Sequence, residues 1–324
     1  MNPLELDLAA AREAEAGVGL LGTPSDRARR LLRWFHQTRS AFTYSLESKT
    51  AREAYATRRG DCFSVTNLFI AFARRLGIDA RYSYVRDVRH FVKNDSFYAS
   101  SHIAAAVIDG ANSELLDFER DAPEHLLASY RVIPDEEAIA LFNSNLVMSD
   151  LAPGKLERAE TIMRFFARTV PTLPEIDSNL SVVLLRRGKT AEALALLEVA
   201  AAKYPTYAPI FTNGLVASMR AGDETKARAF ADGGAEAAKR DPVFAFTQGM
   251  HLFEQGHYEQ ALEYFERAES QDASNPLVLS YVVRVQIARG AAREALETFT
   301  RAWRGHPGDA NLERLRAEHP ELAD

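Results

Sequence analysis

The sequence is poor in the features that several classes of protein need. It has a single cysteine in 324 residues, which excludes an internal disulfide and a cysteine-rich zinc site. No apolar run approaches the roughly 20 residues of a membrane-spanning helix. The first residues, Met1 to Asp7, are acidic and lack the basic and apolar regions of a secretory signal peptide. These absences predict a cytoplasmic protein that does not work at a membrane.

The chain also lacks a surplus of basic residues. Its formal net charge is −6, which argues against a nucleic-acid partner, because phosphates require a basic surface. A length of 324 residues with 47% hydrophobic residues is enough for two domains with their own cores. No metal ion or organic cofactor is expected from this composition.

The single cysteine, Cys62, lies where a helix is expected to begin. Gly60 can adopt backbone angles that other residues avoid, and Asp61 is a suitable N-cap. Apolar residues then repeat at helical spacing as far as Leu76, and Gly77 follows. A thiol in the first helical turn lies at the positive end of the helix dipole, which favours the thiolate. Cys62 is therefore a candidate nucleophile; the alternative is a buried cysteine that acts as a small apolar side chain.

Two further helices are expected before Cys62. The first covers residues 4–16, which are rich in alanine and glutamate and are followed by a glycine-containing break. Thr23 is the expected cap of the second helix, which has a proline in its first turn and runs to about Arg39. Residues 42–44 are expected to be extended.

After Gly77 the apolar residues change from helical spacing to alternation, which predicts strands. The predicted strands are residues 80–85, 102–109, 114–119 and 130–133. Residues 86–101 combine Arg, His, Lys, Asn and Ser and predict a long loop. A loop of that length in a compact domain is more often functional than idle.

The two central strands predict a pair of side chains with a chemical role. Asp109-Gly110 between apolar segments predicts a two-residue hairpin turn. In that register the numbers of opposed residues sum to 219, so His102 lies opposite Asp117. Opposed side chains share a face with Cβ atoms about 4.5–5.5 Å apart, so the carboxylate can orient the imidazole, as in a catalytic triad. A longer turn through Asn112 would shift this register.

Other assignments are possible for these side chains. His90, in the predicted loop, is a rival base, but no carboxylate on a rigid element is evident beside it. His102 could be a strand-end histidine with an ordinary hydrogen bond. Asp117 could face solvent, although aspartate has a low propensity for strands. We prefer His102 with Asp117.

With Cys62, His102 and Asp117 in this order, the N-terminal half resembles the transglutaminase-like superfamily. The resemblance covers about residues 23–135. It is strongest in RRGDCFSVTNLFIAFARRLGIDARY and extends to SHIAAAVID, to LLDFE and to the upstream segment FTY.

The resemblance implies an α+β fold, a papain-like transglutaminase core in which N-terminal helices pack on an antiparallel sheet. It implies that Cys62 is the nucleophile, His102 the general base and then acid, and Asp117 the residue that orients His102. The thiolate would attack a carboxamide or peptide carbonyl, form a thioester, and pass the acyl group to an amine or to water. The backbone N–H of Cys62 would be one oxyanion donor, with Tyr44 and Tyr55 as candidates for the second.

Two positions depart from the pattern of many members of this superfamily. Ala104 stands two residues after the histidine, where an aromatic residue is common, and Phe118 follows Asp117, where proline is common. These departures bear on the acyl-acceptor site.

The C-terminal half repeats every 34 residues, as four glycines and two sets of small residues show: Gly188, Gly222, Gly256 and Gly290; Ala193, Ala227, Ala261 and Ala295; Ala200, Gly234, Ala268 and Ala302. This period is typical of tetratricopeptide repeats (TPRs). Four repeats are predicted, followed by a tail or partial cap: 174–207, 208–241, 242–275, 276–309 and 310–324. The predicted organisation is an N-terminal helix (1–22), a transglutaminase-like domain (23–150), a helical connector (151–173) and an all-α TPR solenoid (174–324).

The first helices of stacked TPRs line a concave face on which a protein or peptide partner can dock. By repeat position, the expected side chains on this face are Arg186, Met219, Arg220, Phe246, Met250, Phe253 and Arg284. Most of them could instead be packing or solvated positions. Asn179 and Asn213 share a repeat position that binds peptide main chain in some TPRs and has a structural use in others.

Two functional hypotheses follow. The first is a transglutaminase-like cysteine peptidase, amidohydrolase or acyltransferase whose TPRs recruit a protein or peptide substrate, with hydrolysis favoured over crosslinking. The second is a catalytically inactive scaffold for protein–protein interaction, with the solenoid as its working part. A role in peptide maturation is a further, weaker possibility.

Overall fold

The computed structural model describes most of the chain: residues 2–39, 42–45, 47–93, 96–109, 112–116, 130–236, 239, 241–271 and 275–322. Within these ranges the side chains of residues 38, 39, 85–93, 96–101, 109 and 112–114 are not described. The chain forms two compact units. One contains Met1–Arg89 and Ser100–Asn179, and the other contains His90–Ala99 and Leu180–Asp324.

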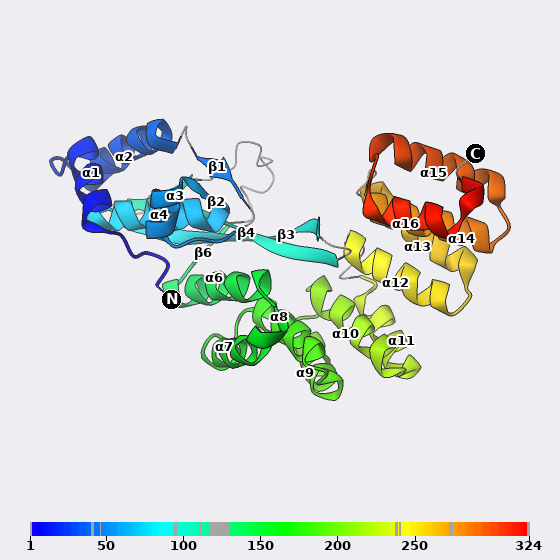
Figure 1. Cartoon of the computed structure of the whole chain (residues 1–324). Helices are drawn as coiled ribbons and strands as arrows, with labels where there is room; N and C mark the ends of the chain where they lie inside the picture. Colours follow the sequence, from blue (N-terminus) through cyan, green and yellow to red (C-terminus); the bar gives the residue numbers. More distant parts are fainter. Residues whose placement is uncertain are drawn as a thin grey trace. The chain divides into compact units, whose positions relative to one another are not determined.

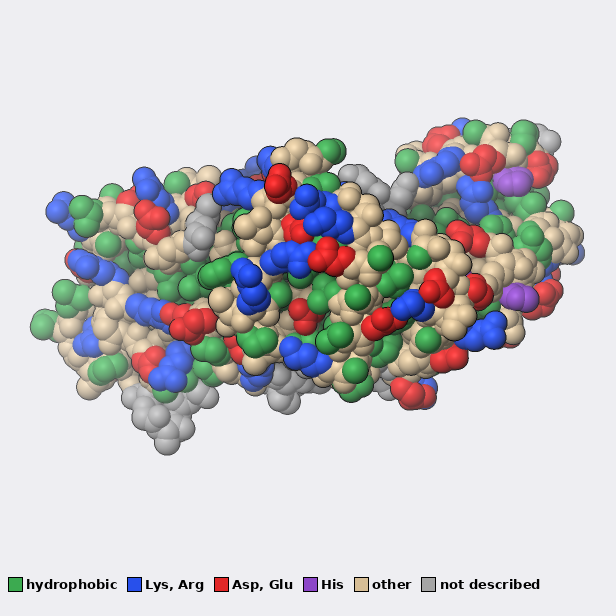
Figure 2. Space-filling model, turned by 90° about the horizontal axis from the view of Figure 1, so that it is seen from below, with side chains coloured by type: hydrophobic (Ala, Val, Ile, Leu, Met, Phe, Trp, Pro, Cys, Tyr) green, Lys and Arg blue, Asp and Glu red, His purple; other side chains and the backbone are tan. Residues whose placement is uncertain are grey.

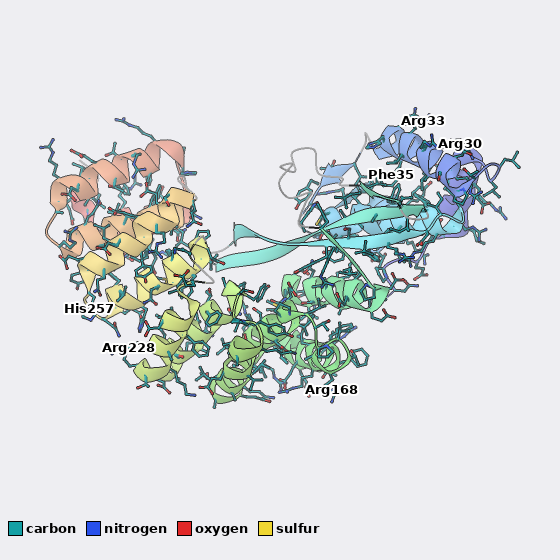
Figure 3. The ribbon with its side chains drawn as sticks, turned by 180° about the vertical axis from the view of Figure 1, so that it is seen from behind. Arg30, Arg33, Phe35, Arg168, Arg228 and His257 are labelled. Atoms are coloured by element: carbon teal, nitrogen blue, oxygen red, sulfur yellow. The ribbon has the colours of Figure 1, made fainter. Side chains whose placement is uncertain are left out.

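The first unit begins with two helices, α1 (Leu8–Val18) and α2 (Pro24–Arg39), which confirm the helices predicted before Cys62. Hydrogen bonds from the Thr23 side chain and backbone lower the pKa of Asp26. Phe35 is buried on the inner side of α2, whereas Arg33 is exposed on the outer side (Figure 3). The Phe35 ring meets the Phe69 ring edge to face, with centroids 5.3 Å apart.

Helix α4 (Cys62–Arg75) lies at the centre of this unit (Figure 1), and all of its residues from Phe63 to Ala73 are buried. Trp34 of α2 meets Phe72 at 5.3 Å between ring centroids. The ring centroid of Phe63 lies 5.9 Å from that of Phe142 in α6 (Asp135–Ser149). The short helix α3 (Ala51–Thr57) leads into α4, and Thr50 and Glu53 form a capping box at its start.

The sheet has four strands in the order β5-β4-β3-β6: β5 (Asn112–Leu116), β4 (Ser96–Asp109), β3 (Ala80–Lys93) and β6 (Arg131–Ile133). A strand is present at each of the four predicted places, and residues 117–119 of the third predicted strand lie outside the described residues. The loop predicted at 86–101 is wrong. β3 continues to Lys93 and β4 begins at Ser96 (Figure 1). The polar residues of this stretch predicted a loop, but strand propensity depends strongly on the neighbouring strands and on burial, which the sequence does not show. Every residue from His102 to Val107 is buried, so both faces of β4 are covered.

The hairpin between β4 and β5 has a different register from the one predicted. Asp109 pairs with Asn112 and Ala106 with Leu115, so the numbers of opposed residues sum to 221 and not to 219. The two residues between the strands are Gly110 and Ala111, with Asp109 in the closing pair. His102 and Asp117 would be opposed only in the register with the sum of 219, which β4 and β5 do not have. Asp117 itself lies outside the described residues.

Buried polar contacts attach α4 to β3. The Tyr82 hydroxyl donates to Asn67 Oδ1 at 2.7 Å, and both side chains have no exposed surface. Burial raises the pKa of Tyr82 well above its usual range, so the phenol stays protonated and can donate. At the end of α4, Arg74 donates to both carboxylate oxygens of Asp135, at 2.5 and 2.8 Å, and to the Ala80 carbonyl oxygen at 3.0 Å.

We expect Tyr82→Phe to lower the free energy of unfolding by about 1–3 kcal/mol, because it leaves the buried Asn67 carbonyl without this donor. Urea denaturation measures the loss. Tyr264→Phe is the matched control: the Tyr264 ring lies 5.0 Å from Arg267 Cζ, a contact that phenylalanine retains. A Tyr82 variant as stable as the Tyr264 variant would contradict the role of this hydrogen bond.

The segment after β6 extends the first unit. It contains α6, a 3₁₀ turn (Pro153–Lys155), α7 (Leu156–Thr169) and the start of α8 (Pro174–Arg186). The Tyr84 hydroxyl donates to Glu175, and the Asn179 amide donates to Ser144 Oγ at 2.8 Å. Asn179 thus makes a structural contact. The two compact units divide within α8, and the domain limits predicted at residues 150 and 173 stay predictions.

From α8, which the two units share, the chain forms helix pairs whose first helices begin 34 residues apart, as the repeat predicts. The first helices are α8, α10 (Ala208–Ala221), α12 (Pro242–Glu254) and α14 (Pro276–Ala288). Their partners are α9 (Thr190–Lys203), α11 (Glu224–Gly234), α13 (Tyr258–Gln271) and α15 (Ala292–Gly305). The four repeat glycines all have positive φ, between 67° and 78°, a conformation that glycine adopts readily. The repeat alanines are buried, as expected where helices cross.

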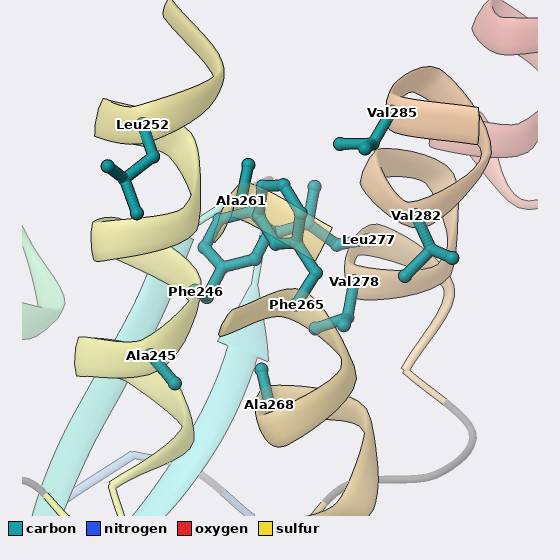
Figure 4. Close-up of a cluster of buried hydrophobic side chains, with 10 residues drawn as sticks. All are labelled: Ala245, Phe246, Leu252, Ala261, Phe265, Ala268, Leu277, Val278, Val282 and Val285. Atoms are coloured by element: carbon teal, nitrogen blue, oxygen red, sulfur yellow. The ribbon is translucent and has the colours of Figure 1, made fainter. Parts of the chain in front are cut away.

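Aromatic and aliphatic side chains fill the space between consecutive repeats. Figure 4 shows Phe246 of α12 and Phe265 of α13 against Leu277 and Val278 of α14. Helix α16 (Ala310–Glu318) begins 34 residues after Pro276 and packs Leu312 and Leu315 on α14 and α15. The tail or partial cap predicted at 310–324 stays a prediction, which this packing supports.

Candidate active site

Cys62 is the first residue of α4 and is partly exposed. Asp61 is the N-cap, as predicted, and its Oδ1 accepts from the Ser64 backbone N–H at 2.8 Å. The Ser64 hydroxyl in turn lies 3.2 Å from the Asp61 backbone N–H, which completes a capping box. The thiol therefore lies in the first turn of a helix whose start is held by two reciprocal hydrogen bonds between Asp61 and Ser64.

Two serines that the sequence analysis did not single out hold the Asp61 carboxylate. The hydroxyl of the fully buried Ser64 donates to Oδ1 at 2.7 Å, and the Ser48 hydroxyl donates to Oδ2. The Lys49 backbone N–H donates to Ser64 Oγ at 2.8 Å. The spacing Asp-x-x-Ser could have indicated Ser64, because it is that of a capping box with serine in place of glutamate. Ser48 carries no such signal.

Gly60 is required for a reason other than the one predicted. Its φ is not positive. A Cβ at this position would instead overlap the Cβ and Oγ of Ser64. The glycine therefore allows the backbone before Cys62 to approach the capping serine.

A short parallel pair of strands places Tyr44 beside the backbone that leads to Cys62. β1 (Thr43–Tyr44) pairs with β2 (Arg59–Gly60), with Tyr44 opposite Gly60. The Ser45 backbone N–H donates to the Gly60 carbonyl oxygen at 3.0 Å. Tyr44 is 62% exposed and so can be reached from solvent.

Tyr55, the other candidate for an oxyanion donor, is engaged elsewhere. Its hydroxyl donates to Glu13 of α1, and its ring lies 6.0 Å from that of Phe72 and 4.4 Å from Arg58 Cζ. These contacts fix the phenol against α1 and the body of α4, so the proposed role for Tyr55 is withdrawn.

His102 lies in β4 and is 3% exposed. Its ring centroid is 6.2 Å from that of Tyr130, at a steep angle of 65°. The Thr66 hydroxyl donates to the carbonyl oxygen of Ile103, the residue after His102, at 3.4 Å. Thr66 is one helical turn after Cys62 and so shares its face of α4. This bond brings the Cys62 face of α4 onto the part of β4 that carries His102.

The remaining predicted side chains fall into three groups. Asp117 and the side chain of the rival base His90 lie outside the described part of the chain. Arg186 and Arg220 are exposed at the ends of α8 and α10, and Met219 is partly buried. Three others line one pocket of the solenoid: Phe246, Met250 and Arg284. Phe253 lies beside that pocket, with its ring 6.5 Å from the Tyr281 ring.

The described residues contain no group of three or more His, Cys, Asp and Glu side chains placed to hold a metal ion. None of the helices in the described ranges is both long and apolar enough to cross a membrane. Basic and acidic side chains are interspersed on the face drawn in Figure 2. Some charged side chains are paired, such as Arg131 with Glu137 at 2.9 Å.

The sequence matches two family models. Residues 13–110 match the transglutaminase-like superfamily, and residues 252–318 match the tetratricopeptide repeat. The chain therefore combines a transglutaminase-like domain with TPRs. The first match includes Cys62 and His102 and ends before Asp117.

Similar solved structures are TPR proteins, and each match covers just over half of this chain. A thermophilic TPR protein of Thermus thermophilus is 20% identical, with 56% of this chain and 97% of that chain covered and a TM-score of 0.46. PilF of Pseudomonas aeruginosa is 17% identical, with 55% and 82% covered and a TM-score of 0.44. YrrB, a TPR protein with an unusual peptide-binding site, is 18% identical, with 56% and 91% covered and a TM-score of 0.42. No curated protein matches the sequence.

The charge of Asp61 should influence the thiol beside it. A neighbouring carboxylate disfavours the thiolate, whereas the helix dipole favours it. Asparagine is as good an N-cap as aspartate, so Asp61→Asn should keep the helix start through Oδ1 and remove the opposing charge. The hydrogen bond that Ser48 donates to Oδ2 is lost with it, because an amide NH2 group cannot accept. We expect alkylation of Cys62 by iodoacetamide at pH 6 to become about threefold to tenfold faster. Asp150→Asn, distant in sequence and paired with Lys155, should leave the rate unchanged; equal rates in both variants would contradict this coupling.

Proposed function

We propose that the N-terminal unit is a papain-like thiol enzyme that transfers or hydrolyses acyl groups. Cys62 attacks a carboxamide or peptide carbonyl and forms a thioester, with His102 as general base. His102 then returns the proton to the leaving amine and later activates the acceptor, water or an amine. Asp117 stays the proposed orienting residue on the strength of the resemblance.

One observation carries this proposal: the hydrogen bond from Thr66 to the Ile103 carbonyl oxygen. It ties the helical face that carries Cys62 to the strand residue next to His102. A helix rises about 1.5 Å per residue, so the Cys62 backbone lies only about 6 Å along α4 from this bond. A nucleophile at a helix start and a base on the adjoining strand are the parts that thiol acyl transfer needs.

The start of α4 also supports stabilisation of an oxyanion. The backbone N–H groups in the first turn of a helix point outward and favour negative charge. We propose the Cys62 N–H as one donor and the Tyr44 hydroxyl as the second. The pairing of Tyr44 with Gly60 and its exposure favour Tyr44 over Tyr55.

The solenoid is proposed to recruit the protein or peptide substrate through the first helices of its repeats. The expected contacts are Arg186, Arg220, Phe246, Met250, Phe253 and Arg284. A TPR surface on the same chain as a thiol enzyme would raise the local concentration of one substrate without further specificity at the thiol.

The alternative function is a scaffold in which the transglutaminase-like domain no longer reacts. The observation that favours it is the burial of His102, which is 3% exposed and lies against Tyr130. Ala104 and Phe118, where many members of the superfamily have an aromatic residue and a proline, point in the same direction.

Trapping of the acyl-enzyme tests the proposal. The purified full chain is incubated with a cell lysate, quenched in acid and digested, and Cys62 is searched for thioester adducts by mass spectrometry. We expect adducts on Cys62 that hydroxylamine removes, with the Cys62→Ala variant as the blank. A Cys62 that stays unmodified in the lysate, and also with the activated ester p-nitrophenyl acetate, would favour the scaffold.

A further inference from the structure

The last repeats of the solenoid form a pocket of about 110 Å³. It is lined from three consecutive first helices: Phe246 and Met250 of α12, Tyr281 and Arg284 of α14, and Arg314 of α16. The volume approaches that of a cavity of about 150 Å³ that holds benzene. The pocket therefore has room for one aliphatic side chain.

The floor of the pocket is formed by apolar side chains that pack in the core between the repeats. Phe246 and Leu277 are each 5% exposed and belong to the core between the repeats (Figure 4). The Tyr281 ring meets the Phe246 ring edge to face at 5.0 Å between centroids. A side chain that enters here meets a surface already held by packing, so little ordering cost is added on binding.

The rim of the pocket is basic, and it already holds a carboxylate of the same chain. Arg284 Nη1 lies 2.5 Å from Glu318 Oε2, and its guanidinium is 5.9 Å from the centre of the Tyr281 ring. This bond lowers the pKa of Glu318. Arg314 donates to Asn311 Oδ1 at 2.9 Å, which keeps a second guanidinium at the rim. Glu318 is the last residue of α16, and its side chain remains 43% exposed.

We propose that this pocket binds an internal segment of a partner protein in which an aliphatic side chain stands next to Asp or Glu. The aliphatic side chain enters the pocket over Phe246 and Tyr281. The acidic side chain takes the place of Glu318 on Arg284, so Glu318 acts as a competitor built into the chain. This inference rests on the proposed recruiting role of the solenoid and gives it a chemical class of partner.

The charge of the rim selects this partner. Two guanidinium groups beside an apolar floor favour a carboxylate and disfavour a lysine or arginine at that position. Arginine binds a carboxylate through two parallel hydrogen bonds, which adds direction to the attraction. Because Arg284 and Glu318 are both partly exposed, the exchange of one carboxylate for another costs little.

Peptide selection tests the proposal. A library of random heptapeptides, displayed between Gly-Ser flanks, is panned on the full chain carrying Glu318→Gln. We expect enrichment of Leu, Ile, Val or Met beside Asp or Glu. The enriched peptide, made with blocked ends, is then measured by fluorescence anisotropy. Enrichment without an acidic residue, or binding that requires a free C-terminal carboxylate, would overturn the proposal.

Matched variants locate the binding site. Relative to the unaltered chain, Glu318→Gln should bind the peptide about threefold tighter, because its own carboxylate no longer competes. Arg284→Gln should bind about tenfold weaker. Glu313→Gln, on the same helix but paired with Arg316, should stay within about twofold. The ¹³C-methyl resonance of Met250 should shift on binding, whichever variant is used. An unmoved Met250 resonance, or equal affinities in all four proteins, would place the peptide elsewhere.

The reaction of Cys62 with p-nitrophenyl acetate is measured in the same variants, because a small ester needs no solenoid. If Cys62 reacts but no peptide is selected, the proposed peptide site is contradicted and the proposed enzyme activity is supported. If a peptide is selected but Cys62 does not react, the proposed enzyme activity is contradicted and the proposed peptide site is supported.

Discussion

Replacing His102 by glutamine should reduce the turnover of p-nitrophenyl acetate at pH 7 by about 10²- to 10⁴-fold, the usual contribution of a general base. Glutamine keeps a polar side chain of similar size in this buried position of β4. Without the imidazole, the acyl-enzyme loses the group that activates water. Stopped-flow release of p-nitrophenolate separates the first acylation of Cys62 from the later turnover.

The pH dependence distinguishes a base from a structural residue. In His102→Gln, the acylation rate should rise with pH until the thiol ionises unaided, so the first burst recovers at alkaline pH whereas turnover at pH 7 does not. A variant that only disturbs the fold would lose the burst at every pH and would melt earlier. A turnover of His102→Gln within about twofold of that of the unaltered chain would show that His102 is not the general base.

Gly60→Ala should lower the free energy of unfolding by about 2–3 kcal/mol, because the added methyl group overlaps Ser64 in a buried, fixed capping box. The same displacement should move the start of α4 and slow the alkylation of Cys62 by iodoacetamide. Urea denaturation and the alkylation rate at pH 6 measure the two effects.

A second substitution tests the cause of the loss. Ser64→Gly alone should cost about 1–2 kcal/mol through the lost cap. Gly60→Ala added to Ser64→Gly should cost little more, because the atoms that clash are gone, and this non-additivity marks a direct contact. Additive losses would show that Gly60 is needed for its backbone conformation instead.

The site was predicted in part from the sequence. The pattern around Cys62 predicted both the helix start and the Asp61 cap, because these depend on residues that are close in the chain. The role of Ser64 was missed although the spacing Asp-x-x-Ser indicates a capping box. The role of Gly60 could not be found in the sequence, because the space that Ser64 takes beside it is known only when the atoms are in place. Tyr55 was one of two candidates for the second oxyanion donor, and its hydrogen bond to Glu13 could not be predicted because Glu13 lies 42 residues away in the chain.

The hairpin shows why a register is hard to obtain from alternation. The predicted and observed registers differ by two in the sum of paired residue numbers, 219 against 221. A shift of two leaves every side chain on the same face, because side chains alternate with a period of two. The apolar pattern therefore fixes the faces of β4 and β5 equally well in both registers. What distinguishes the two registers is which residues lie opposite one another, as in the observed pairs Asp109 with Asn112 and Ala106 with Leu115.

The sequence by itself determined the helix that begins at Cys62, the strands that follow and the 34-residue repeat, because each depends on the spacing of side chains along one segment. The tertiary structure decided what brings separate segments together. It joined α4 to β4 through Thr66 and Ile103, extended β3 and β4 through a polar stretch, and set Arg284 against Glu318 at the rim of a pocket in the last repeats. Such contacts depend on the packing of residues far apart in the chain, and local patterns carry no record of that packing.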